Sequence, residues 1–358
     1  MCGSSLSFRY GVVVAGYSLA GIGITVCVMI THWFFALRNE YALKNISKKG
    51  IDSMLIAVDH GNKQIKLPNG RFFTSGLNES DARPPFGENF LKYKGKYYTL
   101  SNSRIPYMRD KTGDDRFYIL TLFAIGFEIE DSGRYTEDLI PVGLLVGLPP
   151  AHYGRQYKQF EEYFSRGVVE EFEFHGKKFT IRVDEVTAYP QAFAAAMTMF
   201  YQISTYPKAV VIDVGAFTAD YLLIKNGQAD LSVCGSLENG VIVLYNQIAA
   251  RVNSDLDILL EESDIDAILK GEPNGFGEDV RGIVTGAVQI FISDLIGKLR
   301  ERSIDLRSCK AIFVGGGSIL LRKQIEVSGK VASPIFVSNI SANAKGYEIL
   351  YWTSKAKR

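Results

Sequence analysis

The chain has 358 residues, 47% of them hydrophobic and 22% charged, which is typical of a folded protein with room for two domains. Its 40 basic and 39 acidic residues nearly cancel, so no global charge favours direct binding to nucleic acid or to a membrane surface. The four cysteines are scattered without metal-binding spacing, and only four histidines occur, which predicts a reduced, cytoplasmic protein without a cysteine-based metal site.

An apolar segment lies near the N-terminus. Residues 10–37 carry no Asp, Glu, Lys or Arg and are long enough to cross a bilayer as a helix. More basic residues follow this segment than precede it, which would place the rest of the chain in the cytoplasm. A cleaved signal peptide fits less well, because the apolar run is too long. We prefer the alternative that residues 1–53 come from a misplaced start and that the protein begins at Met54.

A buried strand is predicted directly after Met54, in the sequence L-I-A-V-D-H-G-N-K-Q-I-K. The apolar run ends at Asp59, and a polar turn follows that contains Gly61, Lys63 and Lys66. Glycine lets the backbone approach a ligand closely, successive N–H groups can hold an anion, and an aspartate can hold a hydrated divalent cation. One Asp-x-Gly turn is common, so this turn alone is weak evidence for a phosphate site.

The next part of the chain predicts a mixture of strands and helices. Residues 67–135 are rich in Gly, Pro, Tyr and charged residues, which predicts a partly β subdomain that ends in a helix over 116–127. The elements expected after it are a buried strand over 139–148, an amphipathic helix over 153–166 and a hairpin over 172–183.

Residues 183–196 predict an acidic strand end that leads into an alanine-rich helix with Pro190 near its start. Glu185 and Gln191 would then face a cleft, where either could orient a water that attacks a γ-phosphate. An exposed helix cap is the alternative interpretation.

Residues 209–226 repeat the arrangement found at Asp59. An apolar run reaches Asp213, a turn with Gly215 and Thr218 follows, and a second apolar run begins, which predicts two buried strands joined tightly. A β-hairpin with a polar tip would explain this stretch equally well if it stood alone. Two such turns about one domain length apart instead predict a clamp that holds a polyphosphate and its metal from both sides.

The C-terminal third predicts a second group of ligand contacts. The sequence S-L-E-N-G leads into a helix over 241–252, and Glu238 in it could accept hydrogen bonds from ribose hydroxyls. A strand over 309–314 ends in three glycines and Ser318, and such glycines let the backbone lie against a base or a phosphate. The other elements expected here are helices over 255–270 and 280–303, a strand over 334–337 and a closing helix from 342.

Five sequence blocks together resemble the superfamily of actin, sugar kinases and heat-shock-chaperone ATPases, over residues 54–358. V-D-H-G-N-K resembles the first phosphate loop, D-E-V-T-A-Y-P-Q-A the first connecting segment, I-D-V-G-A-F-T-A-D the second phosphate loop, V-G-G-G-S the adenosine loop, and A-N-A-K-G-Y the second connecting helix. Within the superfamily the chain is most similar to the ParM-type bacterial actins that segregate plasmids. His60 and Asn62 depart from the usual pattern, which leaves the phosphate contacts of the first loop open.

The resemblance implies an α/β, actin-like ATPase fold with two α/β domains, each with a mixed β-sheet. It also implies ATP and Mg²⁺ in the cleft between the domains. The expected division is an N-terminal extension over 1–53, domain I over 54–190, domain II over 191–340 and a C-terminal helix over 341–358 that returns to domain I.

The resemblance also implies roles for individual residues. Asp59 and Asp213 would hold Mg²⁺ through water, and Lys66 would approach the β- and γ-phosphates. Glu185, Gln191 and Asp213 would be catalytic. The other nucleotide contacts implied by motif position are Gly61, Asn62, Gly215, Thr218, Glu238, Gly315, Gly316 and Ser318.

The function implied is that of a slow ATPase that polymerises into filaments and segregates plasmid DNA through a small DNA-binding adaptor on the plasmid centromere. Direct sequence-specific binding to nucleic acid is not expected, because the chain is nearly neutral. Two alternatives remain open, since a fold does not determine a function. One is a small-molecule or phosphate-transfer enzyme on the same scaffold. The other is a membrane-tethered scaffold of cell division or secretion, anchored by residues 10–37.

Overall fold

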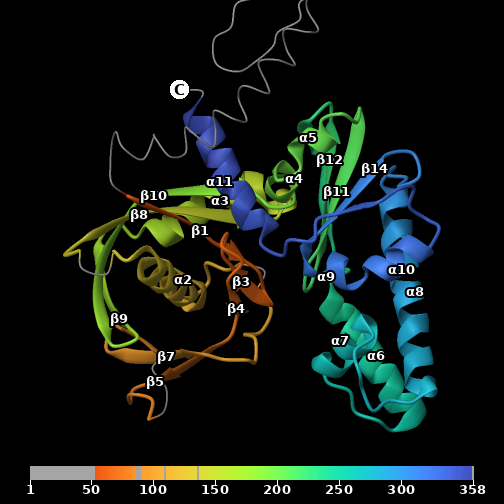
Figure 1. The fold of residues 1–358 in the computed structure, drawn as a ribbon, viewed down its shortest axis with the longest axis horizontal. Helices are drawn as coiled ribbons and strands as arrows, with labels where there is room; N and C mark the ends of the chain where they lie inside the picture. The colour runs from red at the N-terminus through yellow and green to blue at the C-terminus, as the bar shows by residue number, and fades with distance from the viewer. Residues whose placement is uncertain (1–52, 86–89, 109, 135–136, 357–358) are drawn as a thin grey trace, which may run out of the picture. The chain divides into compact units, whose positions relative to one another are not determined.

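The computed structural model describes residues 53–85, 90–108, 110–134 and 137–356. The apolar segment over residues 10–37 therefore lies outside the described residues. All described helices and strands belong to one compact unit, Ser53–Arg358 (Figure 1). Its two largest hydrophobic cores follow one another along the chain, one in each half.

Seven of the described strands form a mixed sheet in the first half of this unit. β8 (Ile140–Leu148) lies inside this sheet and pairs in parallel with β1 (Met54–Ala57) and with β10 (Lys177–Pro190). Its nearly continuous apolar sequence fits a strand that is covered on both faces. The sheet continues with antiparallel pairing through β9 (Val169–Phe174), β6 (Phe90–Tyr93), β7 (Lys96–Leu100) and β5 (Leu77–Ser80).

The first core is covered by two helices, α2 (Arg116–Ser132) and α3 (Pro150–Ser165). Figure 1 shows α2 inside the curve of the first sheet, and its buried side chains belong to the first core. The predicted helix over 116–127 is therefore confirmed and extends to Ser132, because the left-handed Gly133 ends it. A small antiparallel sheet of β2 (Asp59–His60), β3 (Gln64–Lys66) and β4 (Phe72–Thr74) lies in the same half.

The second half contains a five-stranded mixed sheet among the described residues. β11 (Lys208–Val214) and β12 (Ala219–Lys225) pair antiparallel and are almost fully buried, so the predicted pair of buried strands is confirmed. β13 (Gln228–Leu237) extends the sheet on one side. On the other side β14 (Lys310–Val314) and β15 (Ile335–Phe336) pair in parallel. A mixed sheet in each half agrees with the fold class expected from the sequence.

Three longer helices pack on one another in the second half: α6 (Val241–Leu256), α7 (Glu262–Lys270) and α8 (Glu278–Glu301). Within the described ranges, α8 is the one helix that is long and apolar enough to cross a bilayer. Its apolar side chains, such as Phe291 and Leu295, pack in the second core. The shorter helices are α4 (Phe193–Met197), α5 (Phe200–Ile203), α9 (Gly315–Leu320) and α10 (Arg322–Val327).

The last helix, α11 (Ala342–Lys355), connects the two halves. It packs against α4, β8 and β1. Tyr347 is fully buried at this contact, and its ring stacks on Tyr189 with 6.0 Å between the ring centres. A separate apolar cluster of Ala57, Leu145, Ala194, Ala344 and Tyr347 lies here. Residues from both ends of the unit therefore share one packed junction.

The structure corrects the expected transition at residues 183–190. The acidic strand end does not lead into a helix, because β10 continues to Pro190 and pairs with β8 as far as Leu148. Proline is tolerated where a strand ends, since its missing N–H is not needed there. Helix α4 begins only at Phe193, after Ala192 adopts a positive φ of 60°.

A half-buried glutamate on α11 makes stability depend on pH. Burial and then the charge of Glu128 raise the pKa of Glu348 to about 7, from 4.5. The folded chain therefore binds this proton more tightly than the unfolded chain, and stability falls as the pH rises from about 4.5 to 7. We expect Glu348→Gln to raise the free energy of unfolding by about 1–3 kcal/mol at pH 8 and by much less near pH 5.

Urea unfolding at the two pH values measures this difference. Glu162→Gln is the matched control, because Glu162 is an exposed glutamate on α3. A gain for Glu348→Gln that is equal at both pH values would contradict the prediction.

Candidate nucleotide site

A cavity of about 260 Å³ lies between the two halves of the compact unit. Both predicted Asp-x-Gly turns line it, as the sequence analysis expected of a two-sided clamp. The expected site residues that the structure brings together here are Asp59, Gly61, Asn62, Lys66, Gln191, Asp213, Gly215, Thr218, Gly315 and Gly316.

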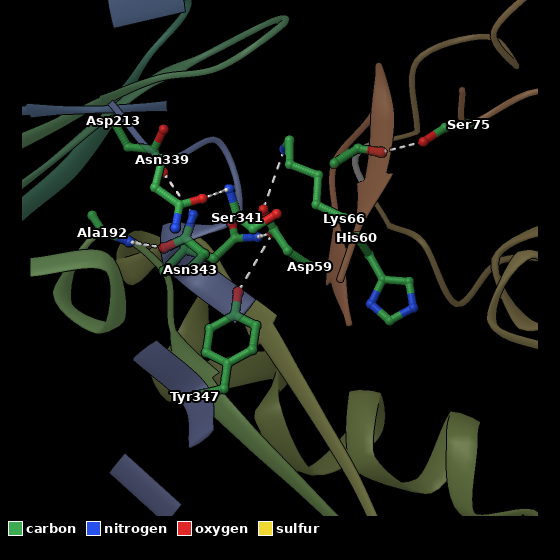
Figure 2. Close-up of polar contacts among 12 residues, drawn as sticks. Asp59, His60, Lys66, Ser75, Ala192, Asp213, Asn339, Ser341, Asn343 and Tyr347 are labelled. Carbon is green, nitrogen blue, oxygen red and sulfur yellow. Dashed lines mark hydrogen bonds and ion pairs between the residues drawn. The ribbon is translucent and has the colours of Figure 1, made fainter. Parts of the chain in front are cut away.

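The first turn is built by the β2–β3 hairpin. Asp59 and Lys66 are paired across the two strands, and Lys66 Nζ lies 3.2 Å from Asp59 Oδ2. The carboxylate is almost fully buried and the lysine is largely buried. Ser75 Oγ donates a hydrogen bond of 2.6 Å to the carbonyl of Gly61, which fixes the turn from behind (Figure 2). The hairpin register therefore places a cation and an anion side by side at the cavity wall.

The second turn places Asp213 at the end of β11. Asn343 Nδ2 donates to Asp213 Oδ2 at 3.0 Å. Burial raises the pKa of Asp213, the hydrogen bond from Asn343 opposes this shift, and the charge of Asp59 adds to it. Gly315 has a φ of 85°, and a side chain there would overlap Asp213 Oδ1. Glycine is therefore required where α9 begins beside this carboxylate.

Two further segments hold the two aspartates. Gln191 Nε2 donates to Asp59 Oδ1 at 2.8 Å, and the Tyr347 hydroxyl lies 3.5 Å from the same oxygen. Asn343 Oδ1 accepts a hydrogen bond of 3.0 Å from the N–H of Ala192. Figure 2 shows Tyr347 and Asn343 extending from the same helix toward Asp59 and Asp213. Helix α11 thus contacts both carboxylates. The A-N-A-K-G-Y block indicated this helix, but not these two contacts.

Asp220 is a third carboxylate in the cavity wall. It lies opposite Asp213 in the β11–β12 register and is buried. Thr218 Oγ1 donates to Asp220 Oδ2 at 3.3 Å, whereas Oδ1 has no hydrogen-bond partner among the described residues. Burial and the charge of Asp213 raise the pKa of Asp220 to about 7. The Thr-x-Asp spacing was visible in the sequence, but only the strand pairing shows that Asp220 faces the same cavity.

Lys111 is a further site residue that no sequence pattern indicated. It comes from the segment between β7 and α2, lines the cavity and donates a hydrogen bond to the carbonyl of His60. Burial lowers the pKa of Lys111 to about 8. A single lysine in a Gly- and Tyr-rich stretch carries no local signal, so only the tertiary fold could show its position.

Three expected site residues do not reach the cavity. Glu185 follows a register shift in β10, and its half-exposed carboxylate pairs with Lys355 Nζ at 3.2 Å on α11. Glu238 lies just past the end of β13 and is exposed, between the buried Leu237 and Asn239. Ser318 is fully buried, because the three glycines form the first turn of α9 and carry the serine into the second half's interior.

The position next to Glu238 has a structural role. Asn239 is buried and accepts a hydrogen bond of 2.9 Å from Lys298 Nζ on α8. It also donates to Asp294 Oδ2 at 2.8 Å. These bonds tie the start of α6 to α8, so this segment supports the second half and does not line the cavity.

His60 turns away from the cavity. Its ring stacks on Phe164 with 4.8 Å between the ring centres, and its Nε2 lies 2.7 Å from Thr121 Oγ1. Burial, followed by the charge of Lys111, lowers the pKa of His60 to about 3, so the ring is neutral. Figure 2 shows the imidazole pointing away from Asp213 and Asn343. At the first loop's departure from the usual pattern, the His60 side chain thus packs in the core, while both His60 and Asn62 belong to the residues that border the cavity.

Charged contacts also join the two halves beside the cavity. Lys63 Nζ lies 3.8 Å from both Glu262 Oε2 and Asp266 Oδ2 on α7. The guanidinium of Arg104 lies 3.4 Å from Glu262 Oε1 and 4.9 Å from the centre of the Phe217 ring. Each pair is partly exposed, so each contributes at most about 1 kcal/mol. Together they connect loops of the first half to the second half.

The donor chemistry of the cavity fits a hydrated magnesium ion. Asp59, Asp213 and Asp220 supply carboxylate oxygens, and magnesium prefers oxygen ligands and keeps several of its waters. Within the described residues no group of three His, Cys, Asp or Glu side chains is close enough to bind a metal ion directly.

Comparisons with known proteins identify the fold. Residues 211–327 match the family model of the C-terminal part of archaeal actin homologue MreB-like proteins. No curated protein matches the chain. An archaeal actin homologue in complex with ADP is 18% identical, with a TM-score of 0.67, covering 84% of this chain and 99% of that one.

Two ParM structures are similar over the same extent. A 15-stranded ParM filament from Clostridium botulinum is 20% identical, with a TM-score of 0.66, covering 84% of this chain and 99% of that one. Bacillus thuringiensis ParM with AMPPNP is 13% identical, with a TM-score of 0.60, covering 85% and 100%.

The chain therefore has the actin-like fold, with two α/β halves that each carry a mixed sheet. Its structural neighbours are ParM proteins and archaeal actin homologues, as the sequence blocks indicated.

Proposed function

We propose that this protein is an actin-type ATPase that binds ATP with magnesium in the cavity between its two halves and assembles into filaments. One observation carries the proposal. Two buried carboxylates at equivalent strand ends, Asp59 and Asp213, line one cavity together with Lys66 and the glycine turns. Such an arrangement suits a polyphosphate, since backbone N–H groups and a lysine hold the anion while carboxylates hold its hydrated cation.

The residues of the cavity have distinct roles in this proposal. Lys66 binds the β- and γ-phosphates, and Asp59 and Asp213 hold the waters of the magnesium ion, which neutralises charge on the phosphates. Gln191 is buried, and its Nε2 already donates to Asp59. Its amide oxygen can accept a hydrogen bond from the attacking water, as a positioned glutamine does in other nucleotidases. Asp220 lies where it can take up the proton of that water.

The similar structures support both parts of the proposal. One neighbour is a complex with ADP, another is a complex with AMPPNP, and a third is a ParM filament. In each comparison, the match to this protein extends over nearly the whole chain of the similar structure. A match over nearly the whole actin-like core supports nucleotide binding and filament assembly by this protein as well.

We further propose that the filaments segregate plasmid DNA in the cytoplasm through a small DNA-binding adaptor. The near-neutral charge of the chain agrees with an adaptor, since the filament need not bind DNA itself. Cell fractionation of the full-length protein tests the location. Sedimentation with membranes would favour a membrane-tethered scaffold instead.

Sedimentation of the full-length protein tests assembly. We expect the protein to pellet with ATP and magnesium, to stay in the supernatant without nucleotide, and to release phosphate slowly. Electron microscopy of the pellet distinguishes filaments from aggregates. Phosphate release without pelleting at high protein concentration would contradict the filament proposal and favour a phosphate-transfer enzyme on the same fold.

A further inference from the structure

Lys111 occupies an unusual position at the wall of the main cavity. Its side chain is buried, although lysine is among the residues least often found inside proteins. It also lines a second cavity of about 50 Å³, which shares Asn62, Pro149 and Thr218 with the main cavity. Lys111 therefore lies between the two cavities and not within the hydrophobic core.

The charge of Lys111 has no carboxylate partner at close range. In the part of the chain that the structure describes, Nζ makes no ion pair within 4.0 Å, and its hydrogen bond goes to the carbonyl of His60. The ring of Phe117 lies 5.4 Å from Nζ. Lys66, by contrast, is paired with Asp59 at 3.2 Å. An ammonium has three N–H donors, and a buried charge is unfavourable unless it is matched.

The turn that carries Lys111 is fixed by its neighbours. Asp110 Oδ1 accepts hydrogen bonds from the N–H of Thr112 at 2.9 Å and from its hydroxyl at 2.6 Å. Gln159 on α3 donates to the same hydroxyl at 2.8 Å. These bonds fix the chain on both sides of Lys111 and link it to α3.

The surroundings of Lys111 identify the end of the cavity that it faces. The charges that act on it most are those of Asp59, Lys66 and Asp220. These residues belong to the phosphate end of the proposed site. Asp59, Asp213 and Asp220 all line the cavity, and Lys66 is already paired with Asp59. Lys111 would therefore supply an uncommitted positive charge to an incoming polyphosphate.

We propose that Lys111 contacts the terminal phosphate of the bound nucleoside triphosphate and makes the site prefer the triphosphate over the diphosphate. This inference rests on the proposed function. It assigns to the segment between β7 and α2 a contact that exists only while the terminal phosphate is present. The segment thereby distinguishes the two nucleotide states of the protein.

The affinities of full-length Lys111→Met for AMPPNP and for ADP test the inference, measured by displacement of a fluorescent nucleotide. We expect the affinity for AMPPNP to fall about 10- to 100-fold, as for loss of a charge-assisted hydrogen bond, and that for ADP to change about threefold or less. Lys111→Arg keeps the charge and is expected to restore part of the preference. Lys178→Met is the control, because Lys178 is exposed on β10 and lines neither cavity.

An equal change in both affinities would overturn the inference, because a purely structural role does not distinguish the nucleotides. Wild-type protein that binds neither nucleotide would overturn the proposed function, and this inference with it. Wild-type protein that binds both, with an unchanged preference in Lys111→Met, would overturn this inference alone.

A second measurement needs no variant and therefore does not depend on the folding of Lys111→Met. The wild-type protein is treated with an amine-reactive acetylating reagent, and the modified lysines are mapped by mass spectrometry. We expect AMPPNP to protect Lys111 and ADP to leave it reactive. Equal reactivity of Lys111 with the two nucleotides would contradict a contact with the terminal phosphate.

Discussion

An Asp213→Asn variant is expected to hydrolyse ATP about 100- to 1,000-fold more slowly than the wild-type protein. Asp213 is buried at the cavity wall, and in the proposed site its charge holds the waters of the magnesium ion. The amide has nearly the same shape and can still accept the hydrogen bond from Asn343, which is 3.0 Å long in the wild-type structure. The loss is therefore expected from the missing charge and not from a disturbed fold.

Phosphate release under single-turnover conditions measures this effect, and urea unfolding shows whether the variant is folded. Burial raises the pKa of Asp213 because it disfavours the charged form. Removal of this charge is therefore expected to leave the free energy of unfolding unchanged or to increase it. Asp230→Asn is the matched control, since Asp230 lies on β13, does not line the cavity, and is a partly exposed carboxylate that pairs with Lys225. Hydrolysis by Asp213→Asn within about twofold of wild type would reject the assignment of this site.

A Gly346→Ala variant is expected to lower the free energy of unfolding by about 2–3 kcal/mol, although alanine normally favours a helix. Gly346 lies on α11, and a side chain there would overlap the backbone of Ala194 on α4. Backbone atoms cannot move aside as a flexible side chain can, so α11 must shift. Asn343 and Tyr347, which contact Asp213 and Asp59, would move with it. Nucleotide affinity is therefore expected to fall together with stability.

Gly297→Ala provides the control for this variant. Gly297 lies within α8, and a side chain there would meet no atom within 4 Å. This change is expected to stabilise the protein by up to about 1 kcal/mol through helix propensity alone. Urea unfolding of both variants gives the comparison. A stabilised Gly346→Ala protein would show that α11 and α4 are not in close contact.

Much of the fold could be predicted from short stretches of sequence. The β11–β12 pair was predictable because two apolar runs flank a turn with Gly215 and Thr218. The same local chemistry indicated Asp59 and Lys66, since the hairpin that pairs them spans only a few residues. Hydrophobic periodicity indicated α2, α6 and α8. In each case the interactions that determine the element are between residues close to one another in the sequence.

Predictions of side-chain direction failed where long-range pairing decided the outcome. Glu185 was expected in the cleft, but β10 runs on beside β8 and leaves this carboxylate with Lys355. The expected positions of Glu238 and Ser318 differ from the structure because the end of β13 and the start of α9 set the directions of these side chains. A motif predicts that a loop lies near a ligand, whereas the neighbouring elements decide which of its side chains reach it.

By itself, the sequence determined that two Asp-x-Gly turns end two buried strands in an α/β chain, because strand periodicity and turn chemistry are local properties. The tertiary structure alone decided what completes the cavity. Asn343 and Tyr347 arrive on a helix more than a hundred residues away from the carboxylates they contact, and Lys111 arrives on a segment without a motif. Such contacts depend on the packing of distant elements, and no spacing along the chain records that packing.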